Sequence, residues 1–463
     1  MKIILSFFLL SVLAFSPDLS GQSLVNFQHL NSLTERIEFY GDSVDIIHVY
    51  SNYPDYRWVD AKESGPEGIA CVDDAARAAV VYLRDYELNH SVSSLEKAKG
   101  LLKFVLKMQT DDGEFYNFIF ADHRINRDGK TSYQSFGWWA ARSVWCLSKG
   151  YRDFISIDPV FAEKLKVAVE RSLPHVEKLL DKYGDVRVVG RLRVPQWLMY
   201  TSGSDVTSEL LLGLLEYDQA AKSVEVKNEI VRLCNALVIM QDGDAETFPY
   251  GAHRSWETMW HMWGNGQTEA LAAIGKAFHD STMILPAERE GRSFYVRLLI
   301  NGFMKEMDIA HPEKRVLYDQ IAYGVRPMAV GLLRVFDATQ DSLYLTLAGL
   351  AASWLFGNNV ARTAMYNPNN GICFDGITDS VTVNKNSGAE STIEALHTLV
   401  EIEHYPDAKK YLYYRKAKQG ETPKYLYATF VDESGEELTL AIALKTGKVL
   451  LREGGIKAIS SEQ

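Results

Sequence analysis

Apolar residues recur along the chain at the spacing of helices that bury one face against a core. Segment 69–88 shows this pattern on a single stripe: Val72, Ala76, Ala79, Val80 and Leu83. Similar segments follow in pairs joined by short turns, which make the two helices antiparallel neighbours. We predict six helical hairpins, with the pairs 69–88 and 93–108, 135–149 and 159–182, 205–219 and 224–240, 267–279 and 286–307, 325–337 and 342–356, and 389–403 and 406–418.

The two helices of each predicted hairpin differ in composition. The first is rich in small residues, as in 75–79, whereas the second carries more charge, as in 94–99. Small side chains let helices crowd around an axis, and charge suits an outer, partly solvated position. We therefore predict an all-α (α/α)6 toroid of two concentric helix layers. An open superhelical solenoid is the alternative, and the lack of a regular repeat length disfavours it.

Long connections follow the second helix of several predicted hairpins. They are rich in aromatic and acidic residues and cover 109–132, 183–202, 241–265 and 357–387. Long loops in compact domains are usually functional. If the hairpins close into a ring, these loops lie on one face, and we expect the chemistry there.

The segments that flank the ring have other patterns. Segment 22–64 holds a predicted helix at 30–39 and an extended piece at 45–50. After the last hairpin, alternating apolar residues at 425–431 and 438–444 predict a small antiparallel β extension. The predicted organisation is a signal peptide (1–21), an N-terminal extension (22–64), the toroid (65–418) and the β extension (419–463).

The first residues resemble a secretion signal. Lys2 precedes an apolar run, 3–15, that is short for a membrane span, and Pro17 ends it. Cleavage is expected near Gly21, although Leu19 is larger than the residue usually found two positions before the cut. We expect an exported protein, periplasmic or secreted, with no membrane span.

Composition narrows the classes of partner. The 463 residues include 49 Lys and Arg against 60 Asp and Glu, a net charge of −11. An acidic chain without a basic stripe is a poor candidate for nucleic acid or an anionic membrane. Aromatic residues make up 11% of the chain, which fits either a large core or surfaces that stack on sugars. The oligomeric state has no sequence signal.

The cysteines and histidines show no spacing typical of a metal site. Cys71, Cys146, Cys234 and Cys373 lie about one hairpin or more apart, and we expect buried thiols rather than disulfides. His123, His253 and His261 match no metal-ligand pattern. We therefore expect no cofactor and no metal.

Two adjacent carboxylates, Asp73 and Asp74, lie in the first turn of the first inner helix. Acids at this position can simply cap the helix and complement its dipole. Alternatively, neighbouring carboxylates that face one cavity shift each other's pKa values, which suits a general acid or base. Arg77 in the fifth position excludes the DDxxD motif of prenyl-diphosphate enzymes.

The connection after the second helix could form a wall that faces a sugar. Asp112 precedes a glycine in a turn, and the extended residues Glu114, Tyr116 and Asn117 follow it. Trp138 and Trp139 begin the next inner helix. Sugars stack on aromatic rings and need polar partners for their hydroxyls. Core packing is the alternative for the two tryptophans.

Further candidates lie where other inner helices begin. The candidates for substrate binding are Glu209, His253, Arg254, Trp256, Trp263, Glu269 and Arg326. Glu390 begins the sixth inner helix and is a catalytic candidate, although its spacing from Ser387 also fits a capping box.

Three short motifs resemble one family. Segments 71–78 (CVDDAARA), 115–118 (FYNF) with 122–124 (DHR), and 388–392 (GAEST) resemble motifs of a helical-toroid domain. That domain occurs in bacterial proteins of carbohydrate metabolism, sometimes attached to glycosyltransferases, and belongs with the six-hairpin glycosidase-like proteins. The resemblance implies a toroid over about 65–405. Segment 132–137 departs from it, because such relatives tend to carry acidic residues and a histidine there.

The leading hypothesis is a glycoside hydrolase that uses two carboxylates on an oligo- or polysaccharide. Asp73 or Asp74 would supply one, and Glu390 or Glu114 the other. The first and sixth inner helices are neighbours in a closed ring, so Asp74 and Glu390 could face one cavity. Arg77, Arg254 and Arg326 are candidates to bind an acidic sugar.

Two alternatives remain open. A polysaccharide lyase would use Tyr116, Tyr250 or His253 as base, with Arg254 neutralising a uronate. A non-catalytic glycan-binding protein would fit the departure at 132–137.

Overall fold

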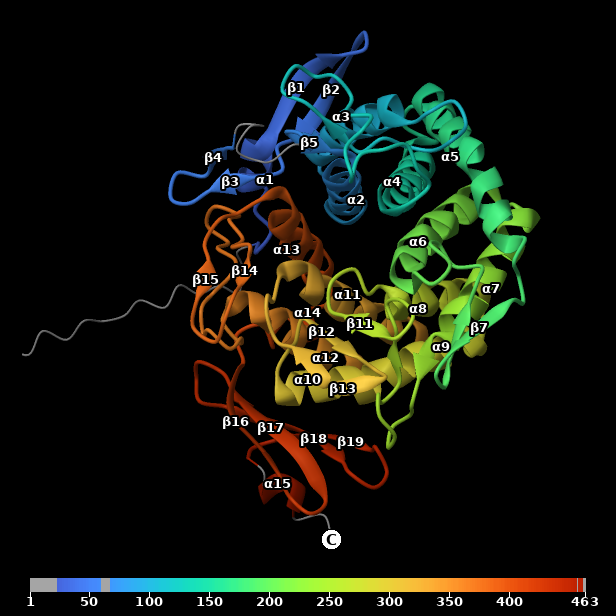
Figure 1. Cartoon of the computed structure of the whole chain (residues 1–463). Coiled ribbons are helices and arrows are strands. Elements are labelled where there is room, and N and C mark those ends of the chain that lie inside the picture. The colour runs from blue at the N-terminus through green and yellow to red at the C-terminus, as the bar shows by residue number, and fades with distance from the viewer. Residues whose placement is uncertain (1–22, 60–66, 456, 461–463) are drawn as a thin grey trace, which may run out of the picture.

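The structure is a computed structural model that describes residues 23–59, 67–455 and 457–460 (Figure 1). The predicted signal peptide, 1–21, lies outside the described residues. None of the described helices is both long and apolar enough to cross a membrane.

Six inner helices form a closed ring. Each packs against the next, and the last packs against the first. In chain order they are α2 (Val72–Asn89), α4 (Trp138–Phe154), α6 (Ser204–Ala221), α8 (Gln267–Phe278), α11 (Ala322–Thr339) and α13 (Ala389–Ile402). The predicted toroid is thus confirmed.

Small residues on the inner helices allow this close packing. A Cβ atom added to Gly213 of α6 would lie 2.7 Å from the backbone nitrogen of Trp145 in α4. Ala75, Ala76 and Ala79 of α2 are fully buried.

Outer helices pair with five of the inner ones. They are α3 (Val92–Met108), α5 (Pro159–Leu180), α7 (Val224–Ile239), α9 (Ser281–Glu290) continued through a π turn (Gly291–Tyr295) into α10 (Val296–Asn301), and α12 (Leu343–Ala352) with its 3-10 turn (Ser353–Phe356). The fourth outer helix was predicted to begin at Pro286. It begins earlier, because Asp280 accepts a hydrogen bond from the backbone N–H of Thr282 and caps it (2.9 Å).

The sixth outer helix is short. The helix predicted over 406–418 is α14 (Pro406–Lys409), and strand β16 (Arg415–Glu421) follows it. The predicted length was therefore wrong. Helix α1 (Gln28–Leu33), from the N-terminal extension, also packs against α13. Of the helix predicted over 30–39, only residues 30–33 are helical, as part of α1, because 34–39 forms a strand.

Short antiparallel sheets lie in the N-terminal extension and in the connections between helices. They are β1 (Thr34–Phe39) with β2 (Asp42–Ile47), β3 (Ser51–Asn52) with β4 (Arg57–Trp58), β5 (Ala70–Cys71) with β6 (Phe118–Ile119), β7 (Val186–Val189) with β8 (Leu192–Pro195), β9 (Gln241–Asp242) with β10 (Ala252–His253), β11 (Met259–His261) with β12 (Glu306–Asp308) and β13 (His311–Val316), and β14 (Gly376–Ile377) with β15 (Val383–Asn384). The fold thus contains more strand than the predicted all-α class with its single β extension.

The C-terminal extension is a four-stranded antiparallel meander attached to one side of the ring (Figure 1, red). Strands β17 (Tyr425–Val431), β18 (Glu437–Ala443) and β19 (Val449–Glu453) follow β16, and α15 (Lys457–Ser460) ends the described chain. Alternate residues of the sheet, such as Phe430 and Leu440, join the main core. Successive side chains of a strand point to opposite faces of the sheet, so these alternate residues form one face, which packs against the ring.

All four cysteines, Cys71, Cys146, Cys234 and Cys373, are buried and unpaired in the structure.

Candidate active site

Two adjoining hollows, of about 340 and 370 Å³, lie at the mouth of the ring where inner helices begin. They share Ile321, Tyr323 and Glu390. We call the first the acidic lobe. It is lined by Asp73, Asp74, Arg77, Arg142, Asp375 and Ser391. We call the second the aromatic lobe. It is lined by Met262, Trp263, Lys305 and Asp319.

Arg77 of α2 links the first inner helix to the sixth. Its buried guanidinium donates hydrogen bonds to Asp74 (2.6 Å), Glu390 (3.2 Å) and Glu394 (3.0 Å). It also lies over the ring of Tyr323, with 4.9 Å from its carbon to the ring centroid. This contact confirms that α2 and α13 are neighbours around one cavity.

Of the two adjacent aspartates, Asp73 is the more accessible. Its side chain is 19% exposed, and that of Asp74 is 4% exposed. Asp74 accepts hydrogen bonds from Arg77 and from the Cys71 thiol (3.2 Å), and burial raises its pKa more than Arg77 lowers it. Asp74 therefore positions Arg77, and Asp73 faces the lobe.

Asp73 is held from two neighbouring elements. Arg142 of α4 lies 2.7 Å from its carboxylate, and Asn117 donates to the same carboxylate at 3.4 Å. The backbone N–H of Asp73 donates to the Asn117 oxygen at 3.1 Å. Asn117 is thus a positioning residue for Asp73. Across Arg77, the side chain of Glu390 is 47% exposed, so the lobe holds two accessible carboxylates, each beside a different guanidinium.

Sequence analysis missed a third carboxylate, Asp375, in the loop before α13. It accepts hydrogen bonds from the backbone N–H of Gly388 (2.8 Å) and from the Ser391 hydroxyl (2.7 Å). Burial raises its pKa above the ordinary aspartate value. These contacts also cap α13, whose own N-cap is a glycine. The only sequence feature that pointed to Asp375 was its place in the long connection predicted over 357–387.

A buried ionic network supports the floor of the cavity. Arg326 of α11 donates to Glu209 (3.0 Å), Glu269 (2.6 Å) and Glu394 (2.9 Å). Burial raises the pKa of Glu269 to about 7, against the opposing effect of Arg326. Glu209, Glu269 and Arg326 were predicted to bind substrate, but they are nearly inaccessible, so the structure assigns them to this supporting network.

Tyr323 joins the network to the cavity. Its oxygen accepts a hydrogen bond from Arg142 (2.6 Å), and its hydroxyl donates to Glu209 (3.1 Å). Arg142 therefore lies between Tyr323 and Asp73. Neither residue was a sequence candidate. Tyr323 lies just before the predicted start of its helix, and Arg142 follows Trp138 by one helical turn.

Three tryptophans gather at the aromatic lobe. Trp263 stacks on His261 at 3.9 Å between ring centroids, and its centroid lies 5.6 Å from that of Trp138 and 6.1 Å from that of Trp256. Trp138, Trp256 and Trp263, all three candidates for substrate binding, are thus brought together, and of these Trp263 lines the lobe itself. Trp139 is buried and donates from its indole N–H to the Phe115 carbonyl (2.7 Å), which is the core-packing alternative.

Other sequence candidates lie away from the lobes. Asp112 accepts hydrogen bonds from Gln134 (2.9 Å) in an exposed turn. Tyr116 packs under Arg127, with 4.7 Å from the guanidinium carbon to the ring centroid, and Glu114 lines neither lobe. The predicted pairing of Asp73 or Asp74 with Glu114 therefore has no common cavity in this structure.

His253 and Arg254 are completely buried beneath their loop. His253 contacts Glu290 at 2.7 Å, and Arg254 donates to the carbonyl of Arg193 at 2.8 Å. Burial lowers the pKa of Arg254. Neither side chain is presented to a substrate, which removes His253 as a base and Arg254 as the uronate partner of the lyase hypothesis but leaves its other candidate bases, Tyr116 and Tyr250, partly exposed.

No protein-family model matches the chain, and no curated protein sequence matches it. Solved structures match its fold at low sequence identity. A cellobiose 2-epimerase from Bacillus thermoamylovorans B4167 has a TM-score of 0.58 and 10% identity, covering 82% of this chain and 96% of its own. A sugar epimerase from a ruminal bacterium has a TM-score of 0.58 and 11% identity, covering 81% and 95%. A D-mannose isomerase has a TM-score of 0.54 and 11% identity, covering 77% and 91%.

Proposed function

Because the chain has the (α/α)6 toroid of the six-hairpin glycosidase-like proteins, we propose that it is a carbohydrate-active enzyme, and specifically a glycoside hydrolase. One observation carries the proposal. Asp73, Asp375 and Glu390 come from three separate segments and line one lobe beside an aromatic wall. Hydrolysis of a glycosidic bond needs two carboxyl groups with different protonation states.

Asp375 is the best candidate for the general acid. Its burial favours the protonated form, which can donate a proton to the leaving oxygen of the glycoside. Glu390 and Asp73 are the candidates for the carboxylate that activates water or attacks the sugar. Each lies beside a buried guanidinium, Arg77 or Arg142.

The aromatic lobe would bind the sugar ring next to the cleaved bond. Trp263 is partly exposed, and its indole can stack on the apolar face of a sugar. Lys305 and Asp319 in the same lobe can bind hydroxyls or an acidic group. We propose an oligo- or polysaccharide as the substrate class.

The test is activity on a panel of oligosaccharides, measured as new reducing ends and as incorporation of ¹⁸O from labelled water. On a cleaved substrate, Asp73→Asn and Glu390→Gln should each lower kcat at least ~100-fold, the usual scale for a lost acid, base or nucleophile. Asp111→Asn, an exposed aspartate outside both lobes, is the matched control. If both site variants retain the wild-type rate, the assignment is wrong.

A sugar epimerase or isomerase is the second candidate, favoured by the activities named for the matching structures. Carboxylates and Tyr323 in the acidic lobe could move a proton at a carbon next to a carbonyl. The two reactions give different products. An epimerase or isomerase keeps the mass of the sugar and places solvent deuterium on carbon, whereas a hydrolase adds water.

We also propose that the protein is exported, on the basis of segment 1–21 alone. Fractionation of cells that express the full chain, with N-terminal sequencing of the product, tests this. A mature protein that begins near residue 22 is expected outside the cytoplasm, and an uncleaved cytoplasmic chain would contradict export.

A further inference from the structure

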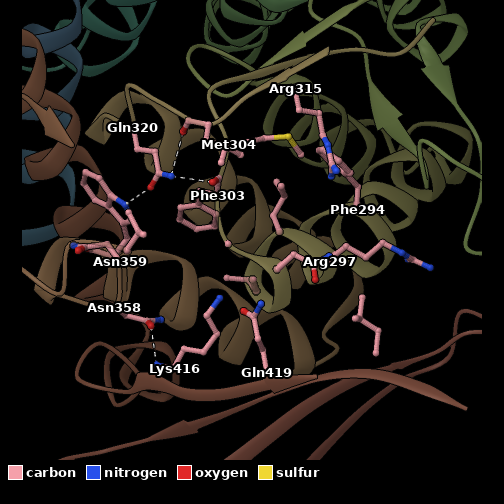
Figure 2. A pocket seen from close by; sticks show the side chains of 18 of the residues that line it. Phe294, Arg297, Phe303, Met304, Arg315, Gln320, Asn358, Asn359, Lys416 and Gln419 are labelled. Atoms are coloured by element: carbon pink, nitrogen blue, oxygen red, sulfur yellow. Dashed lines mark hydrogen bonds between the residues drawn. The ribbon is translucent and has the colours of Figure 1, made fainter. Parts of the chain in front are cut away.

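A second, larger cavity of about 1130 Å³ lies between the ring and the C-terminal sheet. We call it the C-terminal cavity. Its walls come from α10, the segment 302–304, the loop 357–362 and strand β16 (Figure 2). The volume exceeds the range of about 300–1,000 Å³ common for small-molecule pockets.

The charges on this wall are unbalanced. Five basic residues line it: Arg297, Arg315, Arg362, Arg415 and Lys416. Among the described residues, none of the five has a carboxylate within 4 Å. The two acids on the wall, Glu246 and Glu421, are exposed, as are Arg315, Arg362 and Arg415, whereas Arg297 and Lys416 are buried or partly buried. The cavity is therefore complementary to an anion.

Lys416 is the most distinctive of these cations. Its ammonium points from β16 into the cavity and donates to the Ile300 carbonyl at the end of α10 (3.0 Å) (Figure 2). Burial lowers its pKa to about 8, and no acidic neighbour offsets this effect. A partly buried cation without a counter-ion is costly, and a bound anion would relieve that cost.

Arg297 of α10 adds a second buried cation. It is 9% exposed and donates to the carbonyls of Ser293 (3.1 Å) and Ala245 (2.9 Å). Its guanidinium carbon lies 3.7 Å from the centroid of the Tyr250 ring. These partners are neutral, so Arg297 also contributes uncompensated positive charge to the wall.

The rest of the wall is mainly apolar. Phe294, Phe303, Met304, Leu426 and Trp354 contribute to it. Its amides are mostly engaged within the protein. Gln320 donates to the Phe303 carbonyl (2.9 Å) and accepts from the Trp354 indole (3.4 Å).

The side-chain amide of Asn359 donates to the carbonyls of Trp354 (2.8 Å) and Thr363 (2.7 Å). Gln320 and Asn359 are therefore not free to bind sugar hydroxyls, and they share the wall with the aromatic rings of Phe294, Phe303 and Trp354. An apolar body therefore fits this wall better than a saccharide does.

We propose that the C-terminal cavity binds an organic anion with an apolar or aromatic body, with its acid group at Lys416 and its body along the aromatic wall. This inference concerns a second site and does not depend on the reaction at the mouth of the ring. Lys416 and Arg297, buried or partly buried without a carboxylate partner, and the aromatic wall beside them carry it.

The same ligand would touch a wall shared with the proposed active site. Tyr318 and Gln320 line the C-terminal cavity. Their neighbours in the chain, Asp319 and Ile321, line the aromatic lobe. Any effect of the ligand on activity rests on the proposed function, but binding itself does not.

Calorimetric titration of the full chain with octanoate tests the proposal, with 1-octanol as the neutral probe of equal chain length. Octanoate should bind at one site at least 10-fold more tightly than 1-octanol. Lys416→Met should weaken octanoate binding at least 10-fold. Lys448→Met, at an exposed lysine of the same sheet, should leave it unchanged.

Leu426→Trp provides a second variant that fills the cavity and keeps every charge. It should also abolish octanoate binding, so the proposal stays testable if Lys416→Met fails to fold. Equal affinity for octanoate and 1-octanol, unchanged binding in both variants, or no binding of octanoate would overturn the proposal. Binding of digalacturonate in place of octanoate would overturn the apolar-body assignment.

Discussion

At the residue scale, Arg326 holds three glutamates from three inner helices at the centre of the ring. Glu209, Glu269 and Glu394 are all buried around its guanidinium. Removing one partner of a buried ionic group leaves charges that neither water nor protein compensates. The network therefore ties the inner helices together beneath the cavity.

Arg326→Met should lower the free energy of unfolding by about 3–5 kcal/mol, because it leaves these carboxyl groups without their cation. Urea denaturation measures the loss. Arg124→Met is the control, since Arg124 is exposed and pairs only locally with Asp122. A loss below about 1 kcal/mol would show that the network does not hold the ring.

Asp375 gives a pH prediction at the same scale. Its pKa is raised by burial, so its proton is lost only as pH rises above the ordinary aspartate range. If it is the general acid, kcat should fall as pH rises through that raised pKa. In Asp375→Asn, kcat should be at least ~100-fold lower and this alkaline decline should disappear.

The pH–rate profile of both proteins on one cleaved substrate checks this assignment. A variant that keeps the wild-type alkaline limb would exclude Asp375 as the acid. Asp379→Asn, an exposed aspartate of the same loop, should keep the wild-type profile.

At the element scale, the ring depends on how closely its inner helices approach each other. Gly213 of α6 lies against the backbone of α4, and an added Cβ would meet Trp145 and Val144 atoms at 2.7 to 2.9 Å. A backbone neighbour cannot move aside as a side chain can. Gly213→Ala should therefore lower the free energy of unfolding by about 1–3 kcal/mol.

Gly331→Ala in α11 is the matched control. Its Cβ would first meet the Thr268 methyl at 3.1 Å, a side-chain atom with some freedom to move. Thermal or urea unfolding should show a smaller loss for this variant, partly offset by the higher helix propensity of alanine. Equal losses in the two variants would contradict the close-packing argument.

Element by element, the sequence predicted periodic segments better than segments shaped by their neighbours. Helices α3 and α13 match the predicted ranges within a residue or so. The helix predicted over 286–307 ends at Asn301, and its last predicted residue, Met307, lies in strand β12 instead. The helix predicted after Pro406 stops early, because β16 pairs with β17 and tertiary pairing overrides local pattern.

At the whole-molecule scale, the alternation of short and long connections was enough to predict a closed ring with its loops on one face. In the structure Asp73 and Glu390 line the acidic lobe and Trp263 the aromatic lobe, with Trp138 and Trp256 next to Trp263.

Burial depends on tertiary contacts rather than on local sequence. Sequence analysis therefore could not separate the exposed Asp73 from the buried Asp74, or reveal that Glu209, Glu269, His253 and Arg254 are inaccessible. The C-terminal cavity also escaped prediction, since it exists only once the sheet docks on the ring.

The most direct test of the central claim is a crystal structure of Glu390→Gln with a bound oligosaccharide that the wild-type protein cleaves. We predict density for the sugar across both lobes, with a ring stacked on Trp263 and the cleaved oxygen within hydrogen-bonding distance of Asp375. Density confined to the C-terminal cavity or to the outer surface, with both lobes empty of sugar, would contradict the account.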